Sequence, residues 1–238
     1  MTRPVLLDNV THRHLRVHGG HSAATGDARQ SALALPAEFR QLQAHYPIVF
    51  QLVEGGFQPI ALFGLEPDQN LFLKDGAWDA SVLPMAAQRD PFMIGHHGEQ
   101  LQLHVDLDSP RIVRPEEGEV GSAVFMPHGG HSEYLDRMIG LLEHLHAQAQ
   151  ALPAFIEVLM RHQLLEPFVL DVTLGDGAQA RLSGLHTVHE ERLAALPGTV
   201  LESLQRDGHL LPIYMQLASL SRFEDLAARH RRRHLGGV

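Results

Sequence analysis

The chain has 238 residues, of which 44% are hydrophobic, and a net charge of -9 from 19 basic and 28 acidic side chains. A chain of this length buries a sizeable core, in one large domain or two small ones. Neither the acidic nor the basic residues gather into a long face. The chain therefore lacks the basic surface of a nucleic-acid binder, which argues against DNA and RNA as partners. The absence of cysteine excludes disulfides, thiolate nucleophiles and zinc sites built on sulfur.

The sequence also bears on the compartment. The first residues lack the apolar run of about 7–15 residues that a secretory signal needs. Nowhere does an uncharged apolar stretch approach the roughly 20 residues that span a bilayer. We therefore expect a soluble, cytoplasmic protein.

The N-terminal part differs from the rest. Residues 10–31 hold several histidines among glycines with little apolar periodicity, which predicts a histidine-rich arm over residues 1–30. Residues 31–238 are expected to form a single α+β domain. Within it, residues 111–130 are rich in Pro, Gly and Glu and are the best candidate for an internal boundary or a long loop.

The first half of this domain has the pattern of a short helix followed by strands. Apolar spacing predicts a helix over residues 36–45. Short apolar runs separated by Gly and Asp turns then predict an antiparallel meander. The expected strands are residues 48–53, 59–65, 70–74, 92–95 and 100–106, with a short helix over residues 82–89 before the last two.

The second half has mainly helical periodicity. Apolar residues recur every three or four positions over residues 132–164, and Pro153 is expected to kink this helix or split it into a central helical hairpin. The turn Gly175-Asp176-Gly177 predicts a β-hairpin. Its strands are expected at residues 168–174 and 179–185, and closing helices at residues 190–196, 198–206 and 211–231. These elements predict an α+β fold with a meander, a helical hairpin, a second hairpin and C-terminal helices.

Two blocks of the sequence resemble the SapC family of bacterial proteins. The first runs from Tyr46-Pro47-Ile48-Val49-Phe50 to Arg89-Asp90-Pro91-Phe92, and the second from Leu165-Glu166-Pro167-Phe168 to Ser219-Leu220. The resemblance implies a small cytoplasmic protein of undefined biochemistry, often encoded near TonB-dependent outer-membrane receptors, with no catalytic residues to carry over. It therefore implies a binding or accessory role linked to uptake or processing of a surface ligand. A surface-layer assembly component is an alternative, which the missing signal argues against.

A cluster of aromatic residues and prolines in the first block is the candidate ligand site. We predict ligand contacts from Tyr46, Trp78, Arg89 and Phe92. The alternative is a packed core, because aromatic residues at alternating strand positions fill the buried face of a meander. Trp78 follows a turn, so partial exposure is expected there. The partner would be a small ligand or another protein.

The 18 histidines raise a second hypothesis, a metal or haem protein with an oxygenase-like or sensor function. His104-Val105-Asp106 has the spacing of two iron ligands on one strand face, and His146 is a candidate third ligand, beside His144, His162 and His186. A half-buried strand explains the same residues without a metal. The pair His128 and His131 has a metal-ligand spacing but is interrupted by glycines. No cofactor is assigned under the binding hypothesis, whereas iron or haem follows from the alternative.

Overall fold

A computed structural model describes residues 3–98, 100–173 and 179–235, and it has the predicted α+β class. Its strands pair antiparallel in open sheets, and four helices lie near the C-terminus. The chain divides into two compact units, each assembled from segments that are far apart in sequence. The first unit takes the described residues of Met1–Ala28, Leu73–Asp79 and Met85–Ala147, and the second those of Arg29–Phe72, Ala80–Pro84 and Gln148–Val238.

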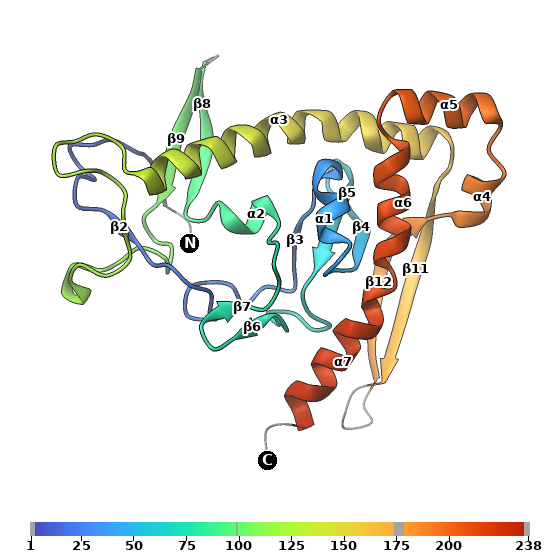
Figure 1. The fold of residues 1–238 in the computed structure, drawn as a ribbon, viewed down its shortest axis with the longest axis horizontal. Coiled ribbons are helices and arrows are strands. Elements are labelled where there is room, and N and C mark those ends of the chain that lie inside the picture. Colours follow the sequence, from blue (N-terminus) through green and yellow to red (C-terminus); the bar gives the residue numbers. More distant parts are fainter. Residues whose placement is uncertain (1–2, 99, 174–178, 236–238) are drawn as a thin grey trace. The chain divides into compact units, whose positions relative to one another are not determined.

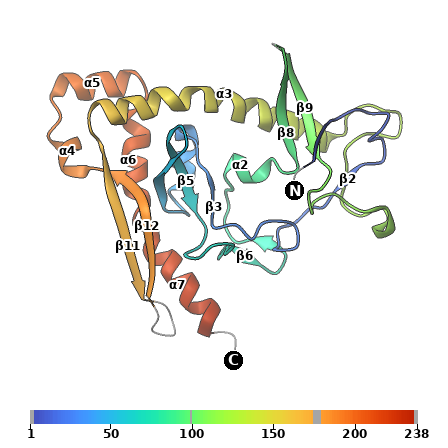
Figure 2. The ribbon, with the colours of Figure 1, turned by 180° about the vertical axis from the view of Figure 1, so that it is seen from behind.

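A three-stranded sheet and the first part of a long helix form the centre of the first unit (Figure 1). Strands β8 (Phe92–His97) and β9 (Gln100–Asp106), both predicted as strands, pair antiparallel, and β1 (Pro4–Leu6) pairs with the other edge of β9. Helix α3 (Glu133–Arg161) begins beside this sheet, as Figure 2 shows from behind. Together they bury a core that includes Val17, Phe92, Val105, Ile112, Val124, Phe125, Leu135 and Leu142.

Short elements complete the first unit. Strand β2 (Arg16–Val17) pairs with β10 (Ser122–Ala123), and β6 (Leu73–Lys74) pairs with β7 (Ala77–Trp78). Their brevity explains why alternation did not predict β2 and β10, since two residues cannot display a period of two. The unit also holds a helix, α2 (Met85–Gln88), and a 3-10 turn, η2 (Pro115–Glu117).

The predicted N-terminal arm contains a buried charge. Asp27 is fully buried, and the Nη2 atom of Arg111 lies 2.7 and 2.6 Å from its two carboxylate oxygens. The Nδ1 atom of His21 lies 3.2 Å from Oδ2 of Asp27, and the Thr25 hydroxyl donates a bond of 3.0 Å to it. Residues 21–27 are thus fixed to residue 111 by an ion pair.

The second unit is built on a five-stranded antiparallel sheet with the order β11-β12-β4-β5-β3. The central pair, β4 (Ile48–Val53) and β5 (Gly56–Leu62), confirms the first two strands of the predicted meander, although β5 begins earlier than expected. The next predicted strand, residues 70–74, does not join this sheet, because Leu73–Lys74 pairs with β7 instead. Strand β3 (Ser31–Leu33) flanks β5. The long hairpin of β11 (Leu165–Thr173) and β12 (Gln179–Val188) confirms the second predicted hairpin, whose turn lies outside the described residues.

Helices cover this sheet. Helix α6 (Leu210–Ser219) packs on β12 and β4, and Figure 1 shows it running alongside the β11–β12 ribbon. The predicted helix over residues 211–231 is wrong in length, because the chain turns at Leu220 and Ser221 before a new helix begins. The other helical elements of the unit are η1 (Pro36–Glu38), α1 (Phe39–Leu42), α4 (Glu190–Ala194), α5 (Gly198–Arg206) and α7 (Arg222–Leu235).

Helix α3 is continuous, so the predicted helical hairpin is wrong. Pro153 lies inside the helix and is exposed. The helix persists because Phe155 and Leu159, which follow the proline, are almost fully buried and offset the lost backbone hydrogen bond. Neither α3 nor another helix in the described part of the chain is long and apolar enough to cross a membrane.

Candidate ligand cavity

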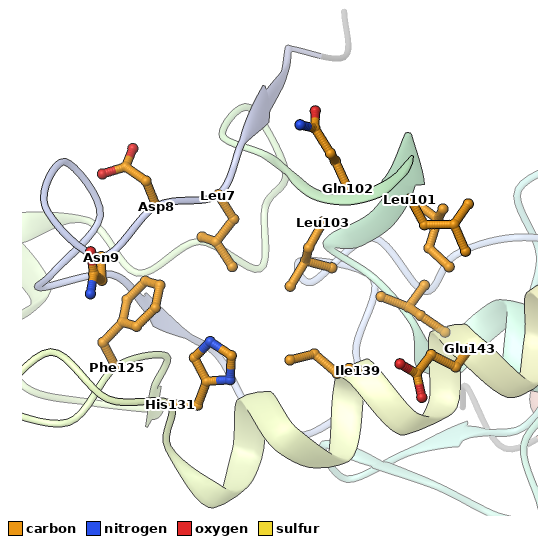
Figure 3. Close-up of a pocket in the computed structure, with 12 residues that line it drawn as sticks. Leu7, Asp8, Asn9, Leu101, Gln102, Leu103, Phe125, His131, Ile139 and Glu143 are labelled. Atoms are coloured by element: carbon orange, nitrogen blue, oxygen red, sulfur yellow. The ribbon is translucent and has the colours of Figure 1, made fainter. Parts of the chain in front are cut away.

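The first unit contains a cavity of about 400 Å3 between the sheet and α3 (Figure 3). Four segments form its wall: the turn after β1, strands β8 and β9, the segment before α3, and the start of α3. The lining residues are Leu7, Asp8, Asn9, Ile94, Leu101, Gln102, Leu103, Phe125, His131, Ile139, Leu142 and Glu143.

The apolar wall follows from two periodicities. On β9, Leu101 and Leu103 point to one face because alternate strand residues share a face. On α3, Ile139 and Leu142 share a face because they are three residues apart. The N–H of Leu7 donates a hydrogen bond of 2.9 Å to the Leu103 carbonyl, which brings the turn after β1 against the same wall.

His131 and Glu143 are polar side chains of this wall. Figure 3 shows the His131 ring turned toward the space and the Glu143 carboxylate along α3 beside Ile139, whereas Asp8 and Gln102 point away. The Nδ1 atom of His131 lies 3.2 Å from a carboxylate oxygen of Asp136, which orients the ring. Because Nδ1 faces a carboxylate, Nε2 is the ring nitrogen that remains for a ligand.

The Asp8 carboxylate serves the local turn instead. Its Oδ1 accepts hydrogen bonds of 2.7 Å from the Thr11 N–H and 2.9 Å from the Val10 N–H. The hydrogen bond from Thr11 is the main reason why the pKa of the Asp8 carboxyl lies below its usual value. Asp8 therefore stays ionised and shapes the wall through the backbone it holds.

This arrangement has a chemical consequence. A carboxylate only accepts hydrogen bonds, so Glu143 presents an acceptor to an otherwise largely apolar space. The Nε2 atom of His131 donates or accepts according to the tautomer of the ring. A complementary ligand has an apolar body and a head group that donates hydrogen bonds.

The structure places the predicted ligand residues in packed surroundings. Tyr46 and Phe92 are fully buried, and the Tyr46 hydroxyl donates a bond of 2.6 Å to the Val82 carbonyl. Trp78 is only 8% exposed, contrary to the expected partial exposure, and its ring meets His21 edge-on at 5.5 Å.

These four residues are divided between the two units. Tyr46 belongs to the second unit, whereas Trp78, Arg89 and Phe92 belong to the first. Arg89 donates to the Phe92 carbonyl at 3.3 Å. Their part in ligand binding stays a prediction.

His104, Asp106 and His146 belong to the first unit, whereas the further candidates His162 and His186 belong to the second. The His104 ring covers Gly95, where an added Cβ would come within about 2.5 Å of the imidazole. The Asp106 carboxylate accepts a bond of 2.7 Å from the Arg3 N–H. His146 lies on α3. Within residues 3–98, 100–173 and 179–235 no group of three or more His, Asp or Glu side chains could hold a metal ion, and the metal role of the three stays a prediction.

Sequence reasoning missed most of the cavity. It singled out His131 only as half of a histidine pair, and Leu101 and Leu103 only as the buried face of a strand. Leu7, Ile139 and Glu143 carried no signal as site residues. The residues around them in the sequence form no motif, because the cavity wall is assembled from segments that are far apart in the chain.

The family to which the chain is similar extends over both units. A family model described as SapC matches residues 7–226, which include every residue of the cavity wall. Searches of the curated proteins and of the solved structures gave no match.

Proposed function

Because the chain belongs to the SapC family, we propose that it is a cytoplasmic binding protein that holds a small, mainly apolar ligand in the cavity of the first unit. The carrying observation is the cavity itself, whose volume of about 400 Å3 lies in the usual range of about 300–1,000 Å3 for small-molecule sites. A role in handling a ligand taken up through a TonB-dependent receptor fits the associations of the family.

The wall supports an apolar ligand body. Leu101 is 48% exposed, and it stands on the cavity wall with Leu103 and Ile139. A ligand chain that covers these side chains removes apolar surface from water, which is favourable by about 25 cal/mol per Å2. The gain grows with the length of the ligand chain until the cavity is full.

The acceptor at Glu143 supports a donating head group. An ammonium group satisfies the Glu143 carboxylate by charge and by hydrogen bonding. A hydroxyl group supplies one hydrogen bond without the charge. A carboxylate head would face Glu143 with the same charge sign and is disfavoured.

We expect calorimetric titration with three ligands of one chain length to reveal this order. Octylamine, which is protonated at neutral pH, should bind most tightly, octanol less tightly and octanoate least. The protein itself needs no preparation beyond purification without a histidine tag. Absence of binding by all three would overturn the proposal, and tighter binding of octanoate than of octylamine would overturn the head-group argument alone.

Two pairs of variants locate the site. Ile139→Trp should fill the cavity and abolish octylamine binding, whereas Met160→Trp, at a position of α3 that is 52% exposed, should leave it unchanged. Glu143→Gln should weaken octylamine by about tenfold, the usual effect of one charge-assisted hydrogen bond, and leave octanol nearly unaffected. Glu202→Gln on α5 is the matched control.

A further inference from the structure

A second cavity of the first unit has an arginine-rich wall. Its volume is about 540 Å3, and it lies between residues 13–16 and residues 113–127. Arg13, Arg16 and Arg114 line it, against a single glutamate, Glu119. Since the whole chain has a net charge of -9, this local excess of positive charge is a departure from the rest of the molecule.

The guanidinium group of Arg16 is held by two carbonyls of the facing loop. The Nε atom of Arg16 donates to the Val120 carbonyl and its Nη2 atom to the Gly121 carbonyl, each at 2.8 Å. Gly121 has a φ of +70°, and a Cβ there would lie 2.4 Å from the Val17 carbonyl oxygen, so glycine is needed for this approach. A guanidinium group held in place loses little freedom when it binds a ligand.

The other two arginines, Arg13 and Arg114, line the same space. Arg13 donates from Nη2 to the Pro127 carbonyl at 2.7 Å, which leaves its Nε and Nη1 outside that bond. Arg114 follows Val113, whose N–H donates a bond of 3.0 Å to the Arg16 carbonyl. The Arg114 side chain is exposed. Three arginines thus line one space.

A neighbouring carboxylate is already engaged. Glu117 accepts a bond of 3.0 Å from the Arg114 N–H, and its other oxygen lies 2.8 Å from Nε2 of His18. Among the residues that line the cavity, Glu119 is then the one carboxylate that opposes three arginines. The wall keeps a net positive charge at neutral pH.

We infer that this second cavity binds an organic oxyanion, a carboxylate or a phosphate monoester. Guanidinium groups match the planar carboxylate and the phosphate oxygens in geometry and charge. Leu15 and Phe125, which also line the space, provide apolar surface for an organic body. The inference goes beyond the proposed function, because the donating head group expected in the first cavity has the opposite chemistry.

The test uses four probes with one aromatic body. Phenyl phosphate and benzoate should bind in a calorimetric titration at low ionic strength, and both should weaken as salt is added. Benzyl alcohol, which is neutral, and benzylamine, which is a cation, should not compete with phenyl phosphate in this titration. Comparison of the two anions shows which oxyanion the cavity prefers.

Two variants localise the effect. Arg114→Gln removes a positive charge from the cavity wall and leaves the bonds from Arg16 to the loop intact. It should weaken the binding of the preferred anion by about tenfold. Arg206→Gln, at an exposed arginine of the second unit, is the control and should change nothing. Thermal unfolding of both variants verifies that they fold.

Backbone amide NMR shifts supply an independent readout. They should change at residues 13–16 and 113–123 when the anion is added. The inference is overturned if neither anion binds, or if Arg114→Gln and Arg206→Gln lose affinity for the anion equally. It is also overturned if the amide shifts change only at other residues. None of these outcomes bears on octylamine binding in the first cavity, so the two proposals fail separately.

Discussion

At the scale of single residues, Asp27 is a fully buried carboxylate with a strongly lowered pKa. Burial alone raises the pKa of its carboxyl, but the hydrogen bond with His21 and the charge of Arg111 outweigh burial and lower the pKa to about 2. Its usual value is 3.8. The folded protein therefore holds this proton less tightly than the unfolded chain, and folding favours the ionised form.

The sign of this shift predicts a loss of stability in acid. The contribution of Asp27 is complete above about pH 4 and disappears as the pH falls to about 2, a change of about 2 kcal/mol. Urea unfolding of the wild type and of Asp27→Asn at several pH values measures it. The variant should be less stable at pH 7, because it leaves Arg111 buried without its counter-charge, and should lose less stability between pH 4 and 2.

A control for general acid effects is Asp171→Asn, at an exposed carboxylate of β11. Its unfolding free energy should depend on pH as that of the wild type does. Equal acid slopes for the wild type and Asp27→Asn would contradict the assigned role of the ion pair.

At the scale of elements, α6 joins two strands that barely pair with each other. Strands β12 and β4 share only two registered pairs, Leu185 with Gln51 and His186 with Phe50. Beyond them, the buried Gln216 of α6 donates to the Ile48 carbonyl at 2.8 Å and accepts from the Val188 N–H at 3.1 Å. One helix side chain thus replaces ladder hydrogen bonds between the strands.

Gln216→Leu should therefore destabilise the protein by about 2 kcal/mol, because it leaves the Val188 N–H without its bond and the Ile48 carbonyl with only the long contact of 3.4 Å from the Ser219 hydroxyl. Ser221→Ala is the matched control, since its exposed hydroxyl bonds only to the Ala218 carbonyl. That control should change the unfolding free energy by less than about 0.5 kcal/mol. Urea denaturation measures both, and equal stability of the two variants would contradict the bridging role.

The elements also show what the sequence could and could not predict. The β4–β5 pair and the β11–β12 hairpin were predictable because alternation and turn residues act locally. The break between α6 and α7 was not, since Leu220 and Ser221 are ordinary helix residues. The chain turns there while the Ser219 hydroxyl, one residue earlier, accepts a bond of 2.9 Å from the Ile48 N–H in β4. The continuity of α3 through Pro153 likewise depends on the burial of later residues.

At the scale of the whole molecule, neither unit is a continuous stretch of chain. The first unit ends within α3, at Ala147, but omits the described residues of Arg29–Phe72. Those residues form β3, β4 and β5 of the second unit, whose partners β12 and α6 lie beyond residue 147. All residues of the first unit therefore lie within the first 147 residues, whereas the second unit needs the chain to its C-terminal helices.

This division predicts the behaviour of the fragment of residues 1–147. The fragment contains all of the first unit but lacks the strand and helix that cover Ile48, Val49 and Phe50. We expect dispersed amide NMR signals from the first unit and signals of an unfolded chain from residues 29–72. Order in residues 29–72, or collapse of the whole spectrum, would contradict the division.

The candidate site was the least predictable part of the molecule. Alternation on β9 and helical spacing on α3 each predicted a buried face, so Leu103 and Ile139 were recognisable as apolar positions. That these faces leave a space between them depends on the turn after β1 and on the sizes of facing side chains. Such complementarity has no local sequence pattern, which is why polar His131 and Glu143 could not be assigned to one site.

Phe125 belongs to the walls of both cavities. A change in the position of its side chain therefore changes the volume of both cavities. A substitution there alters two compartments at once, so Phe125→Ala cannot report on either ligand alone. A ligand that displaces the ring in one cavity therefore also changes the wall of the other.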